Sequence, residues 1–300
     1  MLTGYFDESG HSQDPACRVA GMAGLVAAGG AWEVFEAEWT TLLKNACLPE
    51  AFHMRDFAHS CGQFSTWKGQ EEERRMLIAG LLRIIERTGA IPIGIAVSLD
   101  AFESLTIEQQ LGFKDPYYLA FQHCTRGAAL SVSLEAPDER VNTVYALNSE
   151  FGTQEGGRAE QLWRFVKDHY DYGWRLGVYS STTPDILCPL QAADFFAYEL
   201  CHEFENHIKR PDDGMRFPLR RIIRMSEIPL PMIRFFDRNE LLRQIEEANF
   251  PDQTGVDSIG EEQFEQHKAD MTRWMIRRGQ WDGELPEFAE WDEWKRTNRG

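Results

Sequence analysis

The sequence predicts an α/β fold, in which helices pack on a mixed β-sheet. Two observations carry this prediction. The chain opens with two short apolar runs, 2–7 and 18–28, separated by polar turn residues, and this pattern is typical of an antiparallel β-hairpin. After the hairpin, helical and strand-like patterns alternate along the chain, as in sheets that are covered by helices. We therefore expect the hairpin to supply an antiparallel edge to the sheet.

The first elements after the hairpin are assigned from residue spacing and end signals. Aromatic and leucine residues recur at helical spacing over 32–43, which predicts an amphipathic helix. Residues 70–87 form a second predicted helix, because Glu71 to Glu73 suit its positive end and Gly89 stops it. A buried strand is predicted at 91–99, whereas 51–57 is too short to assign.

The second half of the chain continues the alternation. Asp115 and Pro116 are good first residues for a helix that runs to about 134. We expect strands at 141–147 and 175–180, and helices at 161–170 and 190–206. Beyond 228 the pattern weakens into helical pieces at 240–248 and 261–278 and a Trp-rich acidic tail. We expect one domain over 1–230 and a helical extension over 231–300 packed on it.

The composition excludes several classes of protein. With 300 residues, of which 43% are hydrophobic, the chain is long enough to bury a large core. Its net charge of −17 excludes a protein that coats nucleic acid or an anionic membrane by bulk attraction. Its six cysteines form no Cys-x-x-Cys pair, and no stretch has the pattern of a secretory signal or a membrane span. We therefore expect a cytoplasmic protein with no membrane partner.

Asp7 stands where the first predicted strand ends. Its side chain shares a strand face with Thr3 and Tyr5, while Glu8 points the other way. A carboxylate at the end of a strand is a common metal ligand. The alternative is an Asx-type turn, in which Asp7 only accepts hydrogen bonds from the following backbone N–H groups.

Asp194 interrupts an apolar stripe on the helix predicted at 190–206. Leu190, Ala197 and Cys201 lie on the same face, which we expect to contact the core. A carboxylate there needs an ion pair, hydrogen bonds or a metal. The stripe therefore indicates either a metal ligand or a structural ion pair with an arginine.

Other polar residues are weaker candidates. His53 and Asp56 have the chemistry of a proton shuttle or a substrate contact, but isolated histidines also serve local hydrogen bonds. Tyr117 and Tyr118 are expected to be packing residues. A basic strip follows the helix of Asp194, and it either holds phosphates or forms a solvated face that pairs with the acidic tail. The strip comprises Lys209, Arg210, Arg216, Arg220, Arg221 and Arg224.

Four motifs carry a resemblance to a known family. They are YFDESGH at 5–11, FHMRDF at 52–57, DPYY at 115–118 and LQAADFFAYE at 190–199. In order and spacing they resemble the bacterial family named "domain of unknown function 3800", over about residues 1–230. That family is similar in predicted fold to ribonuclease H and retroviral integrases. The resemblance implies a mixed sheet whose first strand presents Asp7 and whose last core helix presents Asp194.

The resemblance also implies a chemistry. Ribonuclease H-like enzymes hold two divalent ions between carboxylates and hydrolyse phosphodiesters with them. Carboxylates and water suit Mg²⁺ or Mn²⁺. A third carboxylate is expected directly after the strand at 141–147, where this chain has Asn148 instead, followed by Ser149 and Glu150. Asn148 offers a neutral oxygen, Glu150 a longer side chain, and Glu8 a possible extra ligand.

Two functions from different classes follow. The first is a metal-dependent phosphodiesterase or nuclease, in which Asp7, Asp194 and Glu150 or Asn148 hold the metal and Glu8 adds a carboxylate. His53 and the basic residues Lys209, Arg210, Arg220 and Arg221 then contact a locally held nucleic acid. The second is a catalytically silent ribonuclease H-like module that binds a partner protein or nucleic acid, which the substitution by Asn148 favours.

Overall fold

A six-stranded mixed sheet forms the centre of the molecule. The computed structural model describes residues 1–10, 17–113, 115–211, 213–225 and 232–248. Within them the strand order is β5-β4-β1-β2-β3-β6, and β2 runs antiparallel to both of its neighbours while the other pairs are parallel. The strands are β1 (Leu2–Ser9), β2 (Val19–Ala28), β3 (Ile91–Ser98), β4 (Val141–Ala146), β5 (Leu176–Thr182) and β6 (Met232–Phe236).

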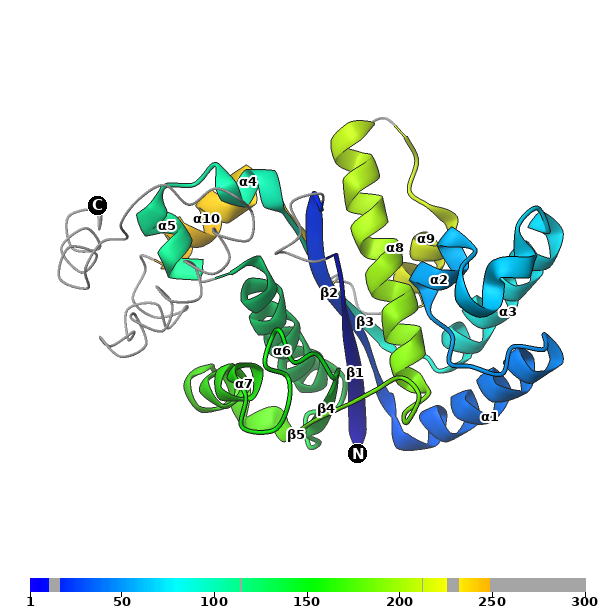
Figure 1. Cartoon of the computed structure of the whole chain (residues 1–300). Helices are drawn as coiled ribbons and strands as arrows, with labels where there is room; N and C mark the ends of the chain where they lie inside the picture. The colour runs from blue at the N-terminus through cyan, green and yellow to red at the C-terminus, as the bar shows by residue number, and fades with distance from the viewer. Residues whose placement is uncertain (11–16, 114, 212, 226–231, 249–300) are drawn as a thin grey trace.

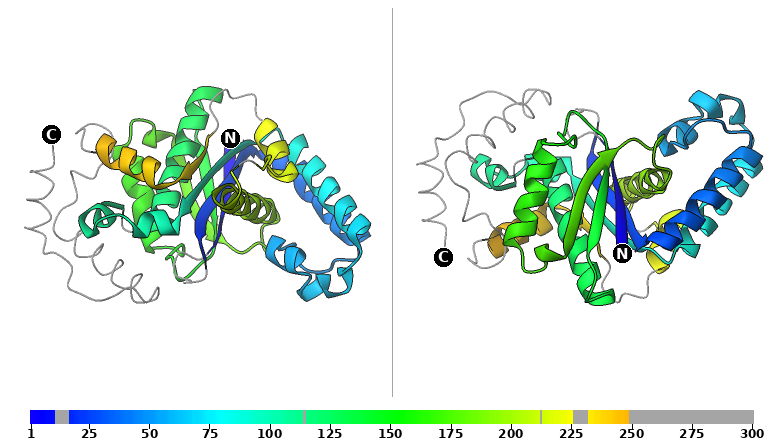
Figure 2. Two further views of the ribbon diagram at one scale, coloured as in Figure 1. Left: turned by 90° about the horizontal axis from the view of Figure 1, so that it is seen from above. Right: turned by 90° about the horizontal axis from the view of Figure 1, so that it is seen from below.

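Helices cover both faces of this sheet (Figures 1 and 2). One face packs against α1 (Gly29–Asn45), α2 (Met54–His59), α3 (Glu71–Arg87), α8 (Pro189–Lys209) and α9 (Phe217–Arg224). The other packs against α4 (Leu99–Glu103), α6 (Pro116–Glu135), α7 (Arg158–His169) and α10 (Arg238–Ala248), and α5 (Ile107–Phe113) precedes α6. Two 3-10 turns lie at Gly62–Trp67 and Gly173–Arg175. The molecule is therefore a three-layer α/β structure.

The elements predicted within the described residues are confirmed, but one prediction about their arrangement is wrong. The opening hairpin forms, with Leu2 opposite Ala28 and Ser9 opposite Gly21. It lies in the middle of the sheet and not at an edge, because β4 pairs in parallel with β1 and β3 pairs with β2. Strands from later in the chain thus enclose the hairpin on both sides.

Two glycines let α8 lie close against the centre of the sheet. A Cβ atom on Gly21 of β2 would come within 2.8 Å of Cys201 Sγ, and one on Gly94 of β3 within 2.7 Å of Leu200 Cδ2. Both partners belong to α8. Larger residues at these positions would push the helix outward. The glycines therefore fix α8 over the sheet at the height that brings Asp194 near the end of β1.

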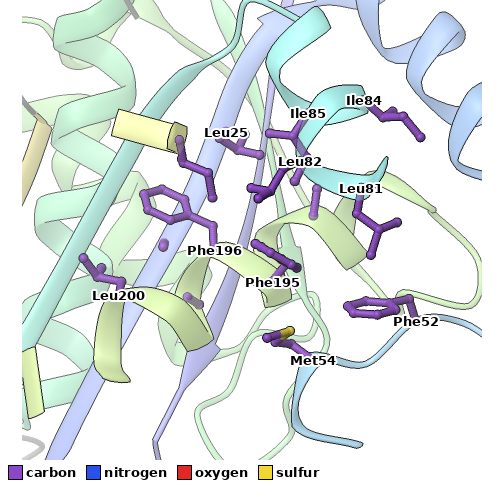
Figure 3. Packing of buried hydrophobic residues seen from close by; sticks show 14 of the residues in the cluster. Leu25, Phe52, Met54, Leu81, Leu82, Ile84, Ile85, Phe195, Phe196 and Leu200 are labelled. Carbon is purple, nitrogen blue, oxygen red and sulfur yellow. The ribbon is translucent and has the colours of Figure 1, made fainter. Parts of the chain in front are cut away.

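The core on the α8 side is a continuous aromatic and aliphatic cluster (Figure 3). Phe52, just before α2, packs on Phe195 of α8 with ring centroids 6.3 Å apart, and on Trp39 of α1 at 6.0 Å. All three side chains are fully buried. This packing fixes the segment that carries His53 and Met54 against α8.

On the opposite face α6 begins where the sequence predicts. Asp115 caps the helix by accepting a hydrogen bond from the Tyr117 backbone N–H at 2.7 Å, and Pro116 is the first helical residue. Tyr117 then stacks on Phe151 with ring centroids 3.8 Å apart. The start of α6 is thereby held beside the loop that follows β4.

The sheet continues past residue 230, where the sequence suggested the domain would end. β6 pairs with β3, with Ile93 opposite Met232, and Leu241 of α10 is buried in the same core as α6. The helix expected at 261–278 and the Trp-rich tail lie outside the described residues. In the part of the chain that is described, no helix is both long and apolar enough to cross a membrane.

Candidate functional site

The candidate site begins where β1 leaves its parallel neighbour. The pairing of β1 with β4 ends at Phe6 and Tyr145, whereas its pairing with β2 continues to Ser9. Asp7 is the first residue beyond this divergence. In open α/β sheets, ligands bind in the crevice outside the carboxyl ends of parallel strands. Asp7 therefore stands at the carboxyl end of β1, where its parallel pairing with β4 has ended.

Asp194 approaches from α8. Its Oδ2 accepts a hydrogen bond from the Met54 backbone N–H at 2.8 Å and lies 3.8 Å from His53 Nδ1. The side chain is 15% exposed. In the described part of the chain no arginine pairs with Asp194, so the structural ion pair considered from the sequence is not formed there. The carboxylate is instead held by a backbone donor and a histidine.

The pKa of Asp7 reflects the nearby carboxylates of Glu8 and Asp194. Asp7 is almost fully buried, and its Oδ1 accepts a hydrogen bond from the Glu8 backbone N–H at 2.8 Å. Burial raises the pKa of Asp7 well above its ordinary value, and the charges of Glu8 and Asp194 raise it further. The three carboxylates therefore repel one another unless a proton or a cation lies between them.

His53 is half exposed at the edge of this group. The Asp194 carboxylate raises the pKa of His53, burial acts in the opposite direction, and the charges of Asp56 and Asp185 add to the increase. The imidazole is thus the positive counterpart of Asp194 on its solvent side. From this position it can donate a hydrogen bond to an anion that reaches the carboxylates.

Glu8 and Asn148 connect the site to the opposite face of the sheet. Asn148 Nδ2 donates to Glu8 Oε1 at 2.6 Å, and Asn148 Oδ1 accepts from the Glu150 backbone N–H at 2.9 Å. Both ends of the amide are therefore used locally. Glu150 has an exposed side chain, and the charges that act on Asp7 are those of Glu8 and Asp194.

Tyr117 lies near Glu8, in the core on the opposite face of the sheet from α8. Its ring is buried, and among the described residues its hydroxyl has no hydrogen-bond partner. Burial raises the pKa of Tyr117 well above its ordinary value, with Glu8 the next cause. A buried hydroxyl without a partner is a place where a water or a ligand atom completes the hydrogen bonding. The prediction that Tyr117 only packs therefore leaves this hydroxyl unexplained.

Most of the basic strip is paired with acidic side chains, and its two residues at the end of α8 lie far from Asp194. Lys209 and Arg210 stand at the far end of α8, about 22 Å along the helix axis from Asp194. Lys209 pairs with Glu205, Arg210 with Asp213, Arg216 with Glu199 and Arg221 with Glu86. Arg220 is exposed on α9. The structure thus brings Asp194 near both Asp7 and His53, with Glu8 beside Asp7 but bonded to Asn148, and it places Lys209 and Arg210 at the far end of α8.

The donor set fits a hard divalent cation held in part by water. Among the described residues, no three His, Cys, Asp or Glu side chains are gathered closely enough to form a complete metal site. Mg²⁺ typically uses one or two carboxylates, several waters and the phosphates of its substrate. Asp7 and Asp194 supply two such oxygens, and the repulsion among the carboxylates favours a cation. The residues present therefore fit Mg²⁺ or Mn²⁺.

Two contributions to the site have no clear sequence signal. The first is the Met54 backbone N–H, whose hydrogen bond to Asp194 cannot be predicted from residue types. Gln191, one helical turn before Asp194, accepts hydrogen bonds from Trp39 Nε1 and the Phe52 N–H at 2.8 and 2.9 Å. The burial of Gln191 and its partners on α1 and before α2 are known only from the structure.

Comparisons with family models, with curated proteins and with solved structures find no match to this chain. The resemblance to the family "domain of unknown function 3800" stays a prediction. The functional argument therefore rests on the geometry described above.

Proposed function

We propose that this protein is a metal-dependent phosphodiesterase, a nuclease that hydrolyses DNA or RNA. One observation carries the proposal: Asp7, at the carboxyl end of β1, and Asp194, on α8, come from distant parts of the chain, yet Asp194 lies close enough for its charge to raise the pKa of Asp7. In the described residues neither forms an ion pair with lysine or arginine. Such a pair is typical of sites that hold a divalent cation for phosphoryl chemistry.

The order of the strands supports a ribonuclease H-like arrangement. The run β3-β2-β1-β4-β5 has the order 3-2-1-4-5 of that fold, and β6 adds a strand beyond β3, so the complete order differs from it. Asp7 lies on the first strand and Asp194 on the long helix that follows β5. These are the two positions that the resemblance assigns to metal ligands.

Each residue of the site has its own role in the proposed hydrolysis. Asp7 and Asp194 would hold Mg²⁺ or Mn²⁺, which supplies Lewis acidity and an activated water when bound. The Met54 N–H fixes one oxygen of Asp194. His53 donates a hydrogen bond to a phosphate oxygen from the solvent side. Glu8, held by Asn148, keeps negative charge beside Asp7.

Cleavage assays with the full chain test this proposal. We expect Mg²⁺- or Mn²⁺-stimulated cleavage of labelled single-stranded or duplex DNA or RNA. Asp7→Asn and Asp194→Asn should each lower the rate by about 100-fold or more, because each removes a ligand charge. Asp168→Asn, an exposed residue of α7, is the matched control and should leave the rate unchanged.

The same assay decides between the proposal and a silent module. The Asn148–Glu8 hydrogen bond favours the silent alternative, because it satisfies a carboxylate with a neutral amide where the resemblance expects a further carboxylate. The absence of metal-stimulated cleavage from all four substrates would reject the nuclease proposal. Equal cleavage by wild type and Asp7→Asn would do the same.

A further inference from the structure

A cavity lies on the α8 side of the molecule, and Gln191 of α8 is one of its lining residues. Its volume is about 790 Å³, and it opens between the end of α1, residues 47–51 and residues 184–188. Buried Trp39, Leu43 and Leu48 form its apolar floor. Its polar rim consists of the exposed side chains of Lys44, Glu50 and Asp185. A floor and rim of this kind suit a small, flat, partly apolar group.

The walls of this cavity are fixed by one side chain, Gln191. Its Oε1 accepts from Trp39 Nε1 on α1 and from the Phe52 N–H, and its Nε2 donates to the Pro184 carbonyl at 3.0 Å. One amide thus ties α1, the segment before α2 and the loop before α8 together. The cavity is therefore preformed and needs little reorganisation to accept a ligand.

Two segments of the chain run from the cavity to the site of Asp194 and His53. Gln191, which lines the cavity, stands three residues before Asp194 on α8, and residues at this spacing lie on the same side of a helix. Ala51, another lining residue, precedes His53 by two positions. A molecule whose phosphate lies at Asp7 and Asp194 therefore has this cavity next to it.

The charges of the rim decide what chemical group fits. Glu50 and Asp185 outnumber Lys44, and the whole chain carries a net charge of −17. A second phosphate would be repelled here. A neutral group with N–H donors would be attracted, because carboxylates accept hydrogen bonds from exocyclic amino groups of bases.

We infer that this cavity binds an unpaired nucleobase with an exocyclic amino group, from the nucleotide whose phosphate lies at Asp7 and Asp194. The inference rests on the proposed nuclease function and names its substrate class, a single strand. A base reaches a side pocket only when it is unstacked and unpaired. Cytosine, adenine and guanine carry the amino group, whereas uracil and thymine do not.

Binding of nucleoside monophosphates to the full chain in Mg²⁺ tests the pocket without activity, because they contain no phosphodiester bond to cleave. Cytidine 5′-monophosphate and uridine 5′-monophosphate are titrated by calorimetry, with inorganic phosphate as a further probe. We expect the cytidine nucleotide to bind at least about tenfold more tightly than the other two. Asp185→Asn together with Glu50→Gln should remove this preference, because the acceptors are weakened.

Two variants that fill the cavity provide a second measurement. Thr40→Trp and Ile186→Trp each place a large ring at exposed lining positions, and both should abolish binding of the cytidine nucleotide. Val34→Trp, at a 56% exposed residue elsewhere on α1, is the matched control. Circular dichroism checks that all three variants fold. Binding that survives in both folded lining variants, or equal binding of the two nucleotides, would overturn the inference.

The outcome is separable from the nuclease proposal. If the pocket is real, Thr40→Trp should lose the preference for cytosine-containing over thymine-containing single strands while it keeps metal-dependent cleavage. If cytidine monophosphate binds in the cavity but nothing is cleaved, the proposed function fails and the base pocket stands. If cleavage occurs and no variant of the pocket changes its preference, the proposed function stands and the pocket inference fails.

Discussion

At the scale of single residues, Asp7 is in an electrostatically costly position. It is buried beside Glu8 and Asp194, and burial followed by these charges raises its pKa well above the ordinary value. At pH values between the pKa of Asp7 in the unfolded chain and its raised pKa in the folded protein, folded Asp7 keeps a proton that unfolded Asp7 releases. Asp7 therefore contributes stability below the ordinary Asp pKa, and this contribution is lost as the pH rises through the raised value.

Asp7→Asn should therefore stabilise the metal-free protein at neutral pH. Thermal unfolding in EDTA should show nearly equal midpoints for variant and wild type below about pH 4. As the pH rises, the variant should become the more stable protein, by roughly 2 °C for each kcal/mol of relieved repulsion. Addition of Mn²⁺ should raise the midpoint of wild type alone. A variant that is less stable than wild type at every pH would contradict this account.

His53 should titrate above an ordinary histidine. Because the Asp194 carboxylate raises the pKa of His53, Asp194→Asn should lower it, and NMR of the imidazole protons in EDTA measures both values. The stability that His53 contributes is present below its unfolded pKa and is lost as the pH rises through the folded value. Asp168→Asn is the control and should leave the pKa of His53 unchanged. If Asp168→Asn lowered this pKa as much as Asp194→Asn does, the interaction of His53 with Asp194 would not be its cause.

At the scale of elements, α8 does more than carry Asp194. Glu199, 1% exposed, accepts from Arg216 Nε at 2.8 Å and Nη2 at 3.0 Å. Glu203 accepts from the Arg216 backbone N–H at 2.8 Å. A single arginine before α9 thus compensates buried negative charge on α8. Because the Arg216 guanidinium is used by Glu199, it is not available to bind a phosphate.

Arg216→Met should be strongly destabilising. It leaves Glu199 buried without a partner, which typically costs about 3–5 kcal/mol. Urea unfolding should show this loss, and the double variant Glu199→Met, Arg216→Met should recover most of it. Arg210→Met breaks an exposed pair with Asp213 and is the matched control, with an expected cost of about 1 kcal/mol or less. If Arg216→Met and Arg210→Met lowered the free energy of unfolding equally, burial of Glu199 would not be what makes its pairing with Arg216 important.

The elements that the sequence predicts share a physical property. Strong periodicity or clear end signals, as in α1, α3, α6 and α8, predict elements that the structure confirms. The elements α4, α5, α9 and β6 were not predicted, because each is short and is held by tertiary contacts more than by its own pattern. The central place of the hairpin also depends on β4 and β3, which pair with it from far along the chain.

The candidate site was predictable where a residue breaks a pattern. Asp194 interrupts an apolar helix face and Asp7 ends a strand, so both stand out in the sequence. Glu8 is predicted to point away from Asp7, and it contacts Asn148 on the other side of the sheet; its charge still acts on Asp7 because the two residues are neighbours in the chain. Gln191 and the Met54 N–H act through contacts between distant segments, and no local pattern reveals them.

At the scale of the whole molecule, charge limits how nucleic acid can bind. The chain has a net charge of −17, and four residues of the basic strip, Lys209, Arg210, Arg216 and Arg221, already pair with acidic side chains. Among the described residues of the strip, this leaves Arg220 and Arg224 without an ion pair and exposed, so the strip offers few cations to neutralise phosphates. Recognition must depend on the local site and not on a general attraction.

This limit predicts a weak dependence of binding on salt. For a single strand, each neutralised phosphate contributes about −0.7 to the slope of log K against log salt concentration. We expect this slope to lie between about −0.7 and −1.4 for the binding of a labelled single strand to Asp194→Asn. Fluorescence anisotropy in EDTA measures it. A slope steeper than about −3 would mean that the strip opens its ion pairs and binds phosphates after all.

The late pairing of β6 with β3 has a consequence for synthesis of the protein. β3 is complete once residue 98 leaves the ribosome, but the strand that covers its outer edge ends only at residue 236. Until then the nascent chain presents the unpaired backbone groups of a buried, apolar strand, which is a template for pairing with other chains. Fragments that end at the sequence-based boundary of 230 keep this edge permanently open, so β6 protects the sheet from self-association.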